Sequence, residues 1–314
     1  MPELPEVQAL ADFFNGRLRS SLLANVELGS LSALKTVLPA LGDLTGRRVV
    51  GFQRHGKFLA MHLSAMPARA VDEDGDDDGH DDRRDDATYL VWHLGRAGWV
   101  HWRDELPAAP LRPGKKSAAL RLGFVTVDGE SIGGFDLTEA GTTKHLAIYV
   151  VTDPMQVPGI ARLGIEPLSE TFTAEAFDAI CVQAGRTQLK GLLRDQSRIA
   201  GIGNAYSDEI LHAARLSPFQ QTDALDDEHR RTLHHCIRTT LEEAIVDCAG
   251  ADPQSLKDLK RAHLQIHDRT GQPCPTCQTA ICEIAFADRS MQYCPTCQTG
   301  GRVLADRRLS RLLK

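Results

Sequence analysis

The sequence lacks a hydrophobic run long enough to cross a membrane, because no stretch approaches the roughly 20 apolar residues that a membrane helix needs. It also lacks a basic region at its start, since residues 1–6 carry two acids and no Lys or Arg, and this excludes a secretory signal. We therefore expect a cytoplasmic protein without a membrane partner. The length of 314 residues predicts about two domains, and 42% hydrophobic residues suffice to form a core.

A positive net charge is also missing, since 36 Lys and Arg against 42 Asp and Glu give −6. This total disfavours contact with nucleic acid, but the distribution of charge matters more. Residues 72–86 hold ten acids and two arginines, so the rest of the chain carries about +2, and residues 254–314 hold ten basic against five acidic residues. We expect a solvated, disordered insertion at 67–87, with a regulatory or DNA-mimic role as the alternative, and a local basic face elsewhere.

The spacing of apolar residues changes along the chain. Residues 6–19 predict an amphipathic helix. Short strand-like runs with turn residues between them then predict an antiparallel sandwich or barrel, at 48–52, 58–62, 89–93, 99–102, 120–127 and 146–151. Residues 152–170 contain Pro and Gly without periodicity and predict a linker. Helices are expected after it, at 173–183, 189–194, 203–214 and from Asp226 onward, which makes the fold class α+β.

Five of the eight cysteines lie within 24 residues near the end of the sequence. Two Cys-x-x-Cys knuckles, Cys274 with Cys277 and Cys294 with Cys297, are separated by 16 residues. Each knuckle presents two thiolates from a tight turn, and two knuckles form a closed tetrahedral zinc site. Because no position is left for water, we expect one structural Zn²⁺ per chain. Four unligated core cysteines are the alternative, and Cys282, which fits neither knuckle, is expected to be a buried filler.

The start of the chain carries a candidate nucleophile. Removal of Met1 would expose the secondary amine of Pro2, and an α-amino group titrates near pKa 7.7–8.0, so part of it is uncharged at neutral pH. Such an amine can attack an electrophilic carbon and form an iminium. Glu3 and Glu6 lie beside it in the sequence and supply carboxyl groups for proton transfer or geometry. The alternative is that Pro2 and Pro5 only begin a helix whose positive end the acids favour.

Four motifs follow one another along the chain: MPELPEV at the start, RHGKFL at 54–59, LRDQSRIAGIGNAYSDEIL at 193–211 and DRSMQYCPTCQ at 288–298. Together they closely resemble the formamidopyrimidine-DNA glycosylase / endonuclease VIII family over nearly the whole chain. The resemblance implies an N-terminal antiparallel β-sandwich with a flanking helix, and a C-terminal helix–two-turn–helix domain with a zinc finger. It also implies a bifunctional DNA glycosylase and abasic-site (AP) lyase whose partner is damaged double-stranded DNA.

The resemblance implies a catalytic role for four residues: Pro2, Glu3, Glu6 and Lys57. Pro2 would attack the sugar C1′ of a flipped nucleotide, Glu3 would act as the acid on the ribose ring oxygen, and Glu6 would support the site. Flipping costs a few kcal/mol, which phosphate contacts would offset. The iminium at C1′ would make the C2′ proton acidic, so that the 3′ and then the 5′ phosphate is eliminated without a metal.

Contacts to the DNA are implied for five residues: Lys57, Arg96, Asn204, Tyr206 and Arg289. Lys57 would contact a phosphate near the lesion. Asn204, in a glycine turn before a helix N-terminus, would hold the strand at the flipped nucleotide, and Arg289 would grip it from the finger. The alternatives are an exposed lysine, helix capping by Asn204, core packing by Tyr206 and a surface arginine.

Three stretches depart from the family pattern. Residues 93–98 read HLGRAG, which places Arg96 where the family inserts a methionine into the duplex, and residues 136–141 read DLTEAG where the family has DPRRFG. Residues 249–269 leave little room for the glycine-containing loop that caps 8-oxoguanine. We therefore expect a preference for oxidised pyrimidines, ring-opened purines or abasic sites over 8-oxoguanine paired with cytosine.

We expect a catalytic sandwich domain at 1–155, a linker at 156–170, a helix–two-turn–helix domain at 171–250 and a zinc-finger module at 251–314. The protein is expected to be a monomer, associated with the nucleoid when on DNA. Two other hypotheses remain open: a damaged-DNA-binding or lyase-only protein with weak base excision, and a zinc-ribbon transcription or topoisomerase accessory factor.

Overall fold

The computed structural model describes residues 1–64, 87–112, 114, 118–286 and 290–304. The chain forms two compact units: unit 1 contains residues 1–2, 7–161 and 250–255, and unit 2 contains residues 3–6, 162–249 and 256–314. The first helix, α1 (Leu4–Leu18), begins in unit 2 and continues in unit 1. Most of the acidic insertion expected at 67–87, and Arg289, lie outside the described residues.

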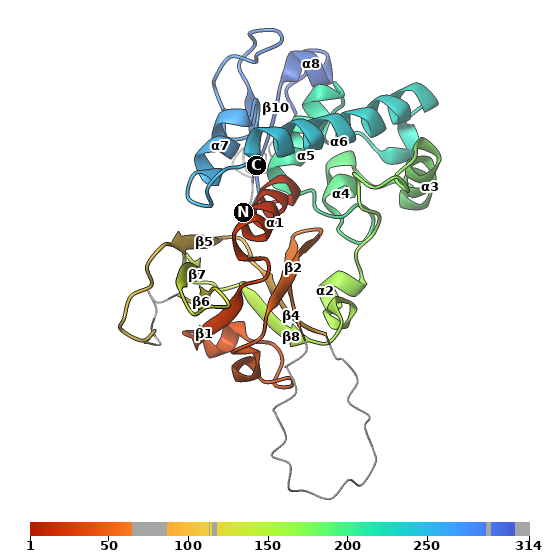
Figure 1. Ribbon diagram of the computed structural model, residues 1–314. Coiled ribbons are helices and arrows are strands. Elements are labelled where there is room, and N and C mark those ends of the chain that lie inside the picture. Colours follow the sequence, from red (N-terminus) through yellow and green to blue (C-terminus); the bar gives the residue numbers. More distant parts are fainter. Residues whose placement is uncertain (65–86, 113, 115–117, 287–289, 305–314) are drawn as a thin grey trace, which may run out of the picture. The chain divides into compact units, whose positions relative to one another are not determined.

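Unit 1 is built from two four-stranded antiparallel sheets, with the strand orders β1-β6-β7-β5 and β2-β3-β4-β8 (Figure 1). The strands are β1 (Leu22–Leu28), β2 (Val49–His55), β3 (Phe58–Leu63), β4 (Thr88–His93), β5 (Gly98–Arg103), β6 (Leu120–Val125), β7 (Ser131–Glu139) and β8 (Ala147–Val151). Three short 3-10 turns, η1 (Leu31–Ala33), η2 (Leu41–Leu44) and η3 (Pro154–Gln156), and helix α2 (Pro158–Ala161) complete it.

Aromatic side chains from both sheets form the core of unit 1. The ring of Phe14, on α1, stacks on Phe135 of β7 at 4.5 Å between centroids and lies 5.0 Å from Phe52 of β2. Trp92 of β4 packs on the same Phe135 ring at 5.7 Å. Since β7 belongs to one sheet and β2 and β4 to the other, these rings bury the facing apolar sides of a sandwich. The predicted antiparallel sandwich with a flanking helix is confirmed.

Two strands and one helix of unit 1 were not predicted from the sequence. Strand β1 is only half-buried along most of its length, and β7 contains Gly133 and Gly134, which are typical of turns. The segment expected to be an irregular linker contains helix α2, and its Ile165 forms an isolated bridge with Ile199.

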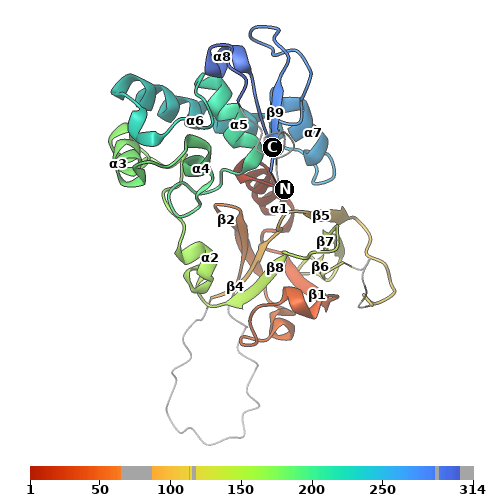
Figure 2. The same cartoon turned by 180° about the vertical axis from the view of Figure 1, so that it is seen from behind.

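Unit 2 is mainly helical, with α3 (Ala174–Ala184), α4 (Leu189–Arg194), α5 (Asn204–Ala213), η4 (Thr222–Ala224), α6 (Asp227–Cys248) and α7 (Leu256–His263) (Figure 2). Two of its helices begin where the capping residues predict. The Thr173 hydroxyl accepts from the Ala176 N–H and caps α3, and the Asp226 carboxylate accepts from the His229 N–H and caps α6. The remaining elements of unit 2 are the hairpin β9 (Cys282–Ala285) and β10 (Ser290–Tyr293), and the helix α8 (Pro295–Thr299).

The core of unit 2 joins the start of the chain to the helix pair α4 and α5. Leu4 is fully buried with Leu192, Tyr206 and Ile210 in one apolar cluster. The Leu4 N–H donates to the Gly201 carbonyl at 3.0 Å. Gly201 has φ +87°, and a Cβ there would lie 2.7 Å from the Leu4 side chain, so this turn requires glycine. The turn between α4 and α5 is thereby fixed against the first residues of the chain.

No helix within the described ranges is both long and apolar enough to span a bilayer.

Candidate functional site

The Glu3 carboxylate is held by the N-terminus of helix α5. Its Oε2 accepts from the Gly203 N–H at 2.5 Å and from the Tyr206 N–H at 3.4 Å, and its Oε1 accepts from the Ala205 N–H at 3.0 Å. These are the unpaired donors of a helix start, and the helix dipole there favours a negative charge. The Glu3 side chain is 3% exposed. Its surroundings therefore stabilise a buried carboxylate directly after Pro2 in the chain.

Glu6 is bound on both of its oxygens. The Tyr206 hydroxyl donates to Oε1 at 2.7 Å, while Oε2 accepts from the Glu3 N–H and from the Lys260 ammonium, both at 2.7 Å. Burial, followed by the Glu6 charge, raises the pKa of Tyr206 far above its usual value. The hydroxyl therefore stays protonated and donates a hydrogen bond to Glu6. Tyr206 is itself fully buried, which favours the packing alternative over a phosphate contact.

Lys260, on α7, is the cation of this group and was not predicted from the sequence. Its Nζ lies 3.7 Å from Glu3 Oε1 and 4.7 Å from the centre of the Tyr206 ring. Burial alone would lower the pKa of Lys260, but the Glu6 and Glu3 carboxylates outweigh burial and raise it. Nothing in the sequence near Lys260 could have revealed these partners, which lie more than 250 residues away along the chain.

Asn204 joins the turn before α5 to the hairpin of the finger. Its Nδ2 donates to the Ser290 carbonyl at 2.8 Å, and its Oδ1 is buried without a hydrogen-bond partner among the described residues. Beside it, the buried Lys190 ammonium donates to the Asn204 carbonyl and to Asp208 Oδ1. A buried acceptor without a donor is costly, so Asn204 is a natural point for an added hydrogen-bond donor.

Helix α5 also anchors the approach to the zinc finger. Glu209 accepts from the backbone N–H groups of residues 265, 266 and 267, at 2.8–3.0 Å. The other oxygen of Asp208 contacts His267 Nδ1 at 2.7 Å and accepts from the Gln292 N–H at 3.3 Å. The finger and the helix are therefore held together by adjacent carboxylates of one helix.

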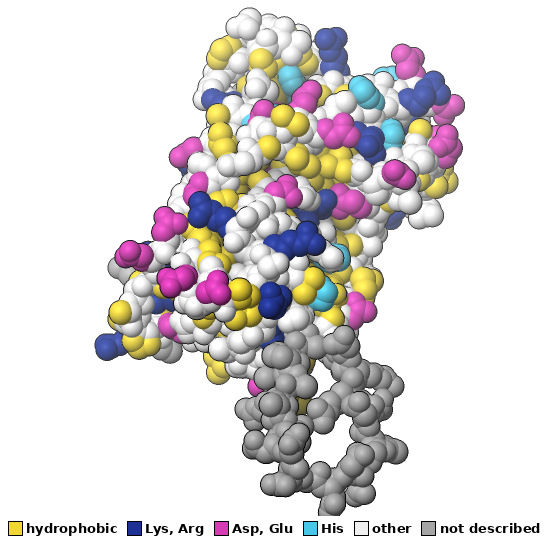
Figure 3. Space-filling view, in the orientation of Figure 1, with side chains coloured by type: hydrophobic (Ala, Val, Ile, Leu, Met, Phe, Trp, Pro, Cys, Tyr) yellow, Lys and Arg dark blue, Asp and Glu magenta, His cyan; other side chains and the backbone are white. Residues whose placement is uncertain are grey.

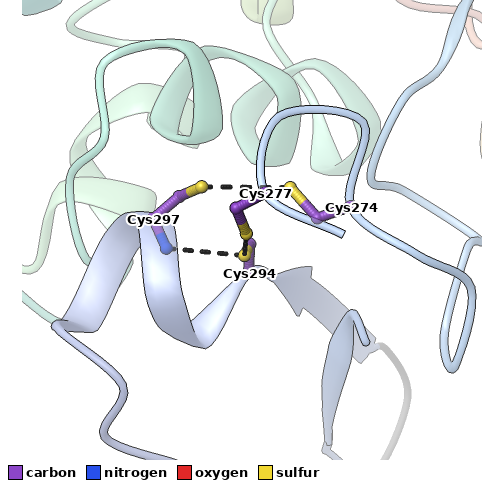
Figure 4. Close-up of side chains that lie close together, drawn as sticks. All are labelled: Cys274, Cys277, Cys294 and Cys297. Carbon is purple, nitrogen blue, oxygen red and sulfur yellow. Dashed lines mark hydrogen bonds between the residues drawn. The ribbon is translucent and has the colours of Figure 1, made fainter. Parts of the chain in front are cut away.

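Four cysteine sulfurs converge in the finger, from Cys274, Cys277, Cys294 and Cys297 (Figure 4). All four lie within 4.8 Å of one another, close to the spacing of about 3.8 Å in a tetrahedral zinc–thiolate site. Hydrogen bonds from Thr279 lower the pKa of Cys277 to about 6, which favours the thiolate that binds metal. Four soft sulfur donors and no others fit a closed structural Zn²⁺ site.

His212, on α5, lies against this site from outside. Its Nε2 is 3.3 Å from Cys274 Sγ. Cys282 is not part of the cluster; it is half-buried and packs with Ile284 and Met291 in a separate apolar group. The expectation for the four zinc ligands thus agrees with the cluster found.

Within unit 1, the turn between β2 and β3 carries Lys57, whose side chain is largely buried. Lys57 acts on His93, at the end of β4, whose pKa falls to about 4 through burial first and the Lys57 charge second. The neutral His93 accepts from the Gly95 N–H through Nδ1 at 3.1 Å. Arg96, in the turn between β4 and β5, is exposed.

Residues 136–141 replace the DPRRFG stretch of the resembling family, and within them Glu139, the last residue of β7, binds the loop that follows the strand. Its carboxylate accepts from the His145 N–H at 2.7 Å and from the Leu146 N–H at 2.9 Å. Glu139 is therefore directed to its own loop. On the face drawn in Figure 3, Lys and Arg side chains are interspersed with Asp and Glu, so the expected basic face is not gathered into one patch there.

The two units and the four-cysteine site define a protein with an N-terminal β-sandwich, a helix–two-turn–helix element and a zinc finger. Residues 1–142 match the "Formamidopyrimidine-DNA glycosylase N-terminal domain", residues 163–254 the "Formamidopyrimidine-DNA glycosylase H2TH domain", and residues 271–300 the "Zinc finger found in FPG and IleRS".

Whole-length relatives agree with these matches. The chain is 35% identical over 287 residues to the formamidopyrimidine-DNA glycosylase of Heliobacterium modesticaldum, covering 88% of this chain and 92% of that protein. It is 52% identical over 132 residues to an uncharacterized formamidopyrimidine-DNA glycosylase-like protein of Mycobacterium tuberculosis, covering 42% of this chain and 84% of that one. The crystal structure of the MutM (Fpg) protein of Thermus thermophilus matches with a TM-score of 0.69 and 27% identity, over 95% of this chain and 98% of the other.

The chain belongs to the formamidopyrimidine-DNA glycosylase family, as its motifs led us to expect. It is accordingly a DNA glycosylase of base excision repair, with one structural zinc ion in its finger. The fold is also that of a Lactococcus lactis family member bound to DNA containing an AP site, with a TM-score of 0.72, 23% identity, and coverage of 95% of this chain and 99% of the other.

Proposed function

We propose that this chain is a bifunctional glycosylase and AP lyase in which Pro2 is the nucleophile. The observation that carries the proposal is the pair of buried carboxylates that follow Pro2 in the sequence, with Glu3 fixed by the N-terminus of α5 and Glu6 fixed by Tyr206. The structure contains Met1, so the reaction requires that Met1 be removed first.

The chemistry follows from a Glu3 that is charged at rest. The neutral Pro2 nitrogen attacks C1′ and the damaged base departs with the bonding electrons, later taking a proton from solvent. Glu3 accepts the proton from the Pro2 nitrogen, which is positively charged once it is bonded to C1′, and passes this proton to the ring oxygen as the C1′–oxygen bond breaks. This leaves an iminium between Pro2 and C1′, with a free 4′ hydroxyl.

Strand cleavage then uses the same iminium. It draws electrons from C1′, so the C2′ proton is lost and the 3′ phosphate leaves, followed by the 5′ phosphate in a second elimination. No step draws on the zinc ion, which acts by holding the finger in shape.

Contacts to damaged duplex DNA are assigned to four residues: Lys57, Arg96, Asn204 and Arg289. Lys57 and Arg289 would bind phosphates, which supply affinity without reading sequence. The unpartnered Oδ1 of Asn204 supports a contact there, and the exposed Arg96 supports insertion at the flipped nucleotide. Tyr206 positions Glu6 in this proposal and does not contact the DNA.

The lesion preference rests on the altered loops. Glu139 stands where the family pattern has arginine, and it is bound to its own loop, so reading of the base opposite the lesion is changed. We therefore assign oxidised pyrimidines, ring-opened purines and abasic sites as preferred substrates. Equal activity on 8-oxoguanine paired with cytosine would contradict this assignment.

The division of the chain after Ala161 supports a catalytic domain at 1–155 and a linker at 156–170. The domain matches at residues 163–254 and 271–300 support a helix–two-turn–helix domain at 171–250 and a finger at 251–314. The protein would act as a monomer in the cytoplasm, on the nucleoid when bound to DNA. Gel filtration with an abasic duplex measures the stoichiometry, and two copies per duplex would contradict the monomer.

Borohydride trapping on a duplex with one abasic site tests the mechanism. The processed wild type should form a covalent adduct, and Pro2→Gly or a form that keeps Met1 should not. Damage-selective binding without an adduct would instead support the damaged-DNA-binding alternative. Binding without preference for damage would support an accessory zinc-ribbon protein.

A further inference from the structure

Lys260 is a buried, charged residue to which the proposed mechanism assigns no role. Its side chain is 13% exposed, and its Nζ touches Glu6 Oε2 at 2.7 Å and approaches Glu3 Oε1 at 3.7 Å. Both carboxylates are almost wholly buried, at 3% and 0% exposure. A lysine of the short helix α7 thus reaches both acids that follow Pro2 in the sequence.

The charges around this ammonium do not cancel. The carboxylates of Glu3 and Glu6 and the Cys248 thiol of α6 act on it, and the Tyr206 ring of α5 lies under it. Backbone N–H donors bind both carboxylates, but they carry no full charge. A buried carboxylate without a counter-charge is strongly unfavourable. Lys260 therefore supplies a full positive charge at the Glu3–Glu6 pair, in direct contact with Glu6.

Resting on the proposed function, we propose that Lys260 is a positioning residue for this reaction: its ammonium holds the Glu3 and Glu6 carboxylates as one fixed, ionised pair. Glu3 then starts the reaction able to take the proton of the Pro2 amine. Glu6, bound by Lys260 and Tyr206 together, keeps the Glu3 backbone in place through its bond to the Glu3 N–H.

Replacing Lys260 by Met keeps the unbranched apolar part of the side chain and removes the ammonium with its charge. The carboxyl pair would then bind a proton more readily, because the cation in contact with Glu6 is lost, and a protonated Glu3 cannot receive the proton of Pro2. The acid limb of the rate profile should consequently move to higher pH. Buried groups that also face this pair, Lys190 and Tyr206, stay unchanged in the variant.

The experiment measures single-turnover adduct formation with borohydride on an abasic-site duplex, from pH 5 to pH 9, for the processed, zinc-loaded enzyme. Lys260→Met should slow the reaction about 100-fold at neutral pH and shift the acid limb upward, with the duplex Kd changed less than about threefold. Lys260→Arg, which keeps the charge, should react at least about tenfold faster than Lys260→Met. The control Lys257→Met changes an exposed lysine of the same helix and should match the wild type.

A Lys260→Met rate within about threefold of wild type, or an unshifted acid limb, overturns the inference while leaving the proposed function intact. Absence of any adduct with the wild type would instead refute the proposed function itself. If Lys260→Met does not fold, the pair Glu6→Gln with Lys260→Met removes both charges together. It should react at least about tenfold more slowly than Glu6→Gln alone, because Glu3 still loses its cation, and equal rates overturn the inference.

Discussion

Substituting Gly203 by Ala should disable the Glu3 carboxylate without unfolding the protein. An added Cβ would lie 2.4 Å from Glu3 Cδ and 2.7 Å from each carboxylate oxygen, whereas ordinary contacts begin at 3.4 Å. Gly203 has a negative φ of −122°, so no left-handed backbone adds to this overlap. The carboxylate must retreat by about 1 Å, because the added Cβ would be fixed to the backbone at the start of α5.

The displacement sets the expected loss of rate. The bond from the Gly203 N–H to Oε2, now 2.5 Å, would lengthen to about 3.5 Å and no longer count as a hydrogen bond. A hydrogen bond to a charged group contributes about 1.5–3 kcal/mol, and a 1 Å misplacement at a reacting group costs about 100-fold in rate. We expect borohydride-trapped adduct to form about 100-fold more slowly under single-turnover conditions.

The matched control is Gly16→Ala, at an exposed position of α1 where an added Cβ meets nothing within 4 Å. It should leave the rate unchanged and add about 0.5–1 kcal/mol of stability, as expected for Gly to Ala inside a helix. If Gly203→Ala retains zinc and a wild-type melting curve and yet reacts within threefold of wild type, the role given to Glu3 is wrong.

Three further predictions concern other parts of the chain. His212→Phe should speed zinc release to a chromogenic chelator about tenfold, because the contact with Cys274 is lost, and an unchanged release rate would refute that role. Asp136→Asn should cost about 3 kcal/mol of unfolding free energy at pH 7, since its buried carboxylate pairs with Arg121. Burial raises the pKa of Asp136, but hydrogen bonds from two arginines outweigh burial and lower it. The stabilisation is therefore present above the unfolded pKa near 4 and is lost as pH falls through the folded pKa. Urea melts that give the same difference in unfolding free energy between wild type and Asp136→Asn at pH 7 and pH 3 would contradict this. Arg289→Ala should weaken binding to every lesion and lower the salt slope of the duplex Kd by about one unit, and an unchanged slope would exclude a phosphate contact.

Several features could be predicted because the physics that fixes them is local. Each Cys-Pro-Thr-Cys knuckle places two sulfurs within one turn, so the ligands of the zinc site follow from spacing. The starts of α3 and α6 follow from Thr173 and Asp226, whose side chains bond to N–H groups three residues on. Helix α4 was also predicted with its observed bounds, Leu189–Arg194, although no side chain caps its start.

Strand β7 could not be predicted, because its glycines are explained only by its neighbours. A Cβ at Gly134 would lie 2.1 Å from the Leu122 carbonyl of β6, so the residue is glycine for close strand pairing and not for a turn. The sequence shows the glycine, but it does not show which carbonyl group of a neighbouring strand the glycine will face.

The sequence by itself determined the family, the metal ligands and the two acids that follow Pro2, since each is encoded within a few residues. Only the tertiary structure decided which groups hold those acids. Their partners, the helix start at Gly203, the Tyr206 hydroxyl and the Lys260 ammonium, lie 200 or more residues away. A buried carboxylate must be matched by donors and a counter-charge from whatever part of the chain packs on it, and no local pattern records which part that is.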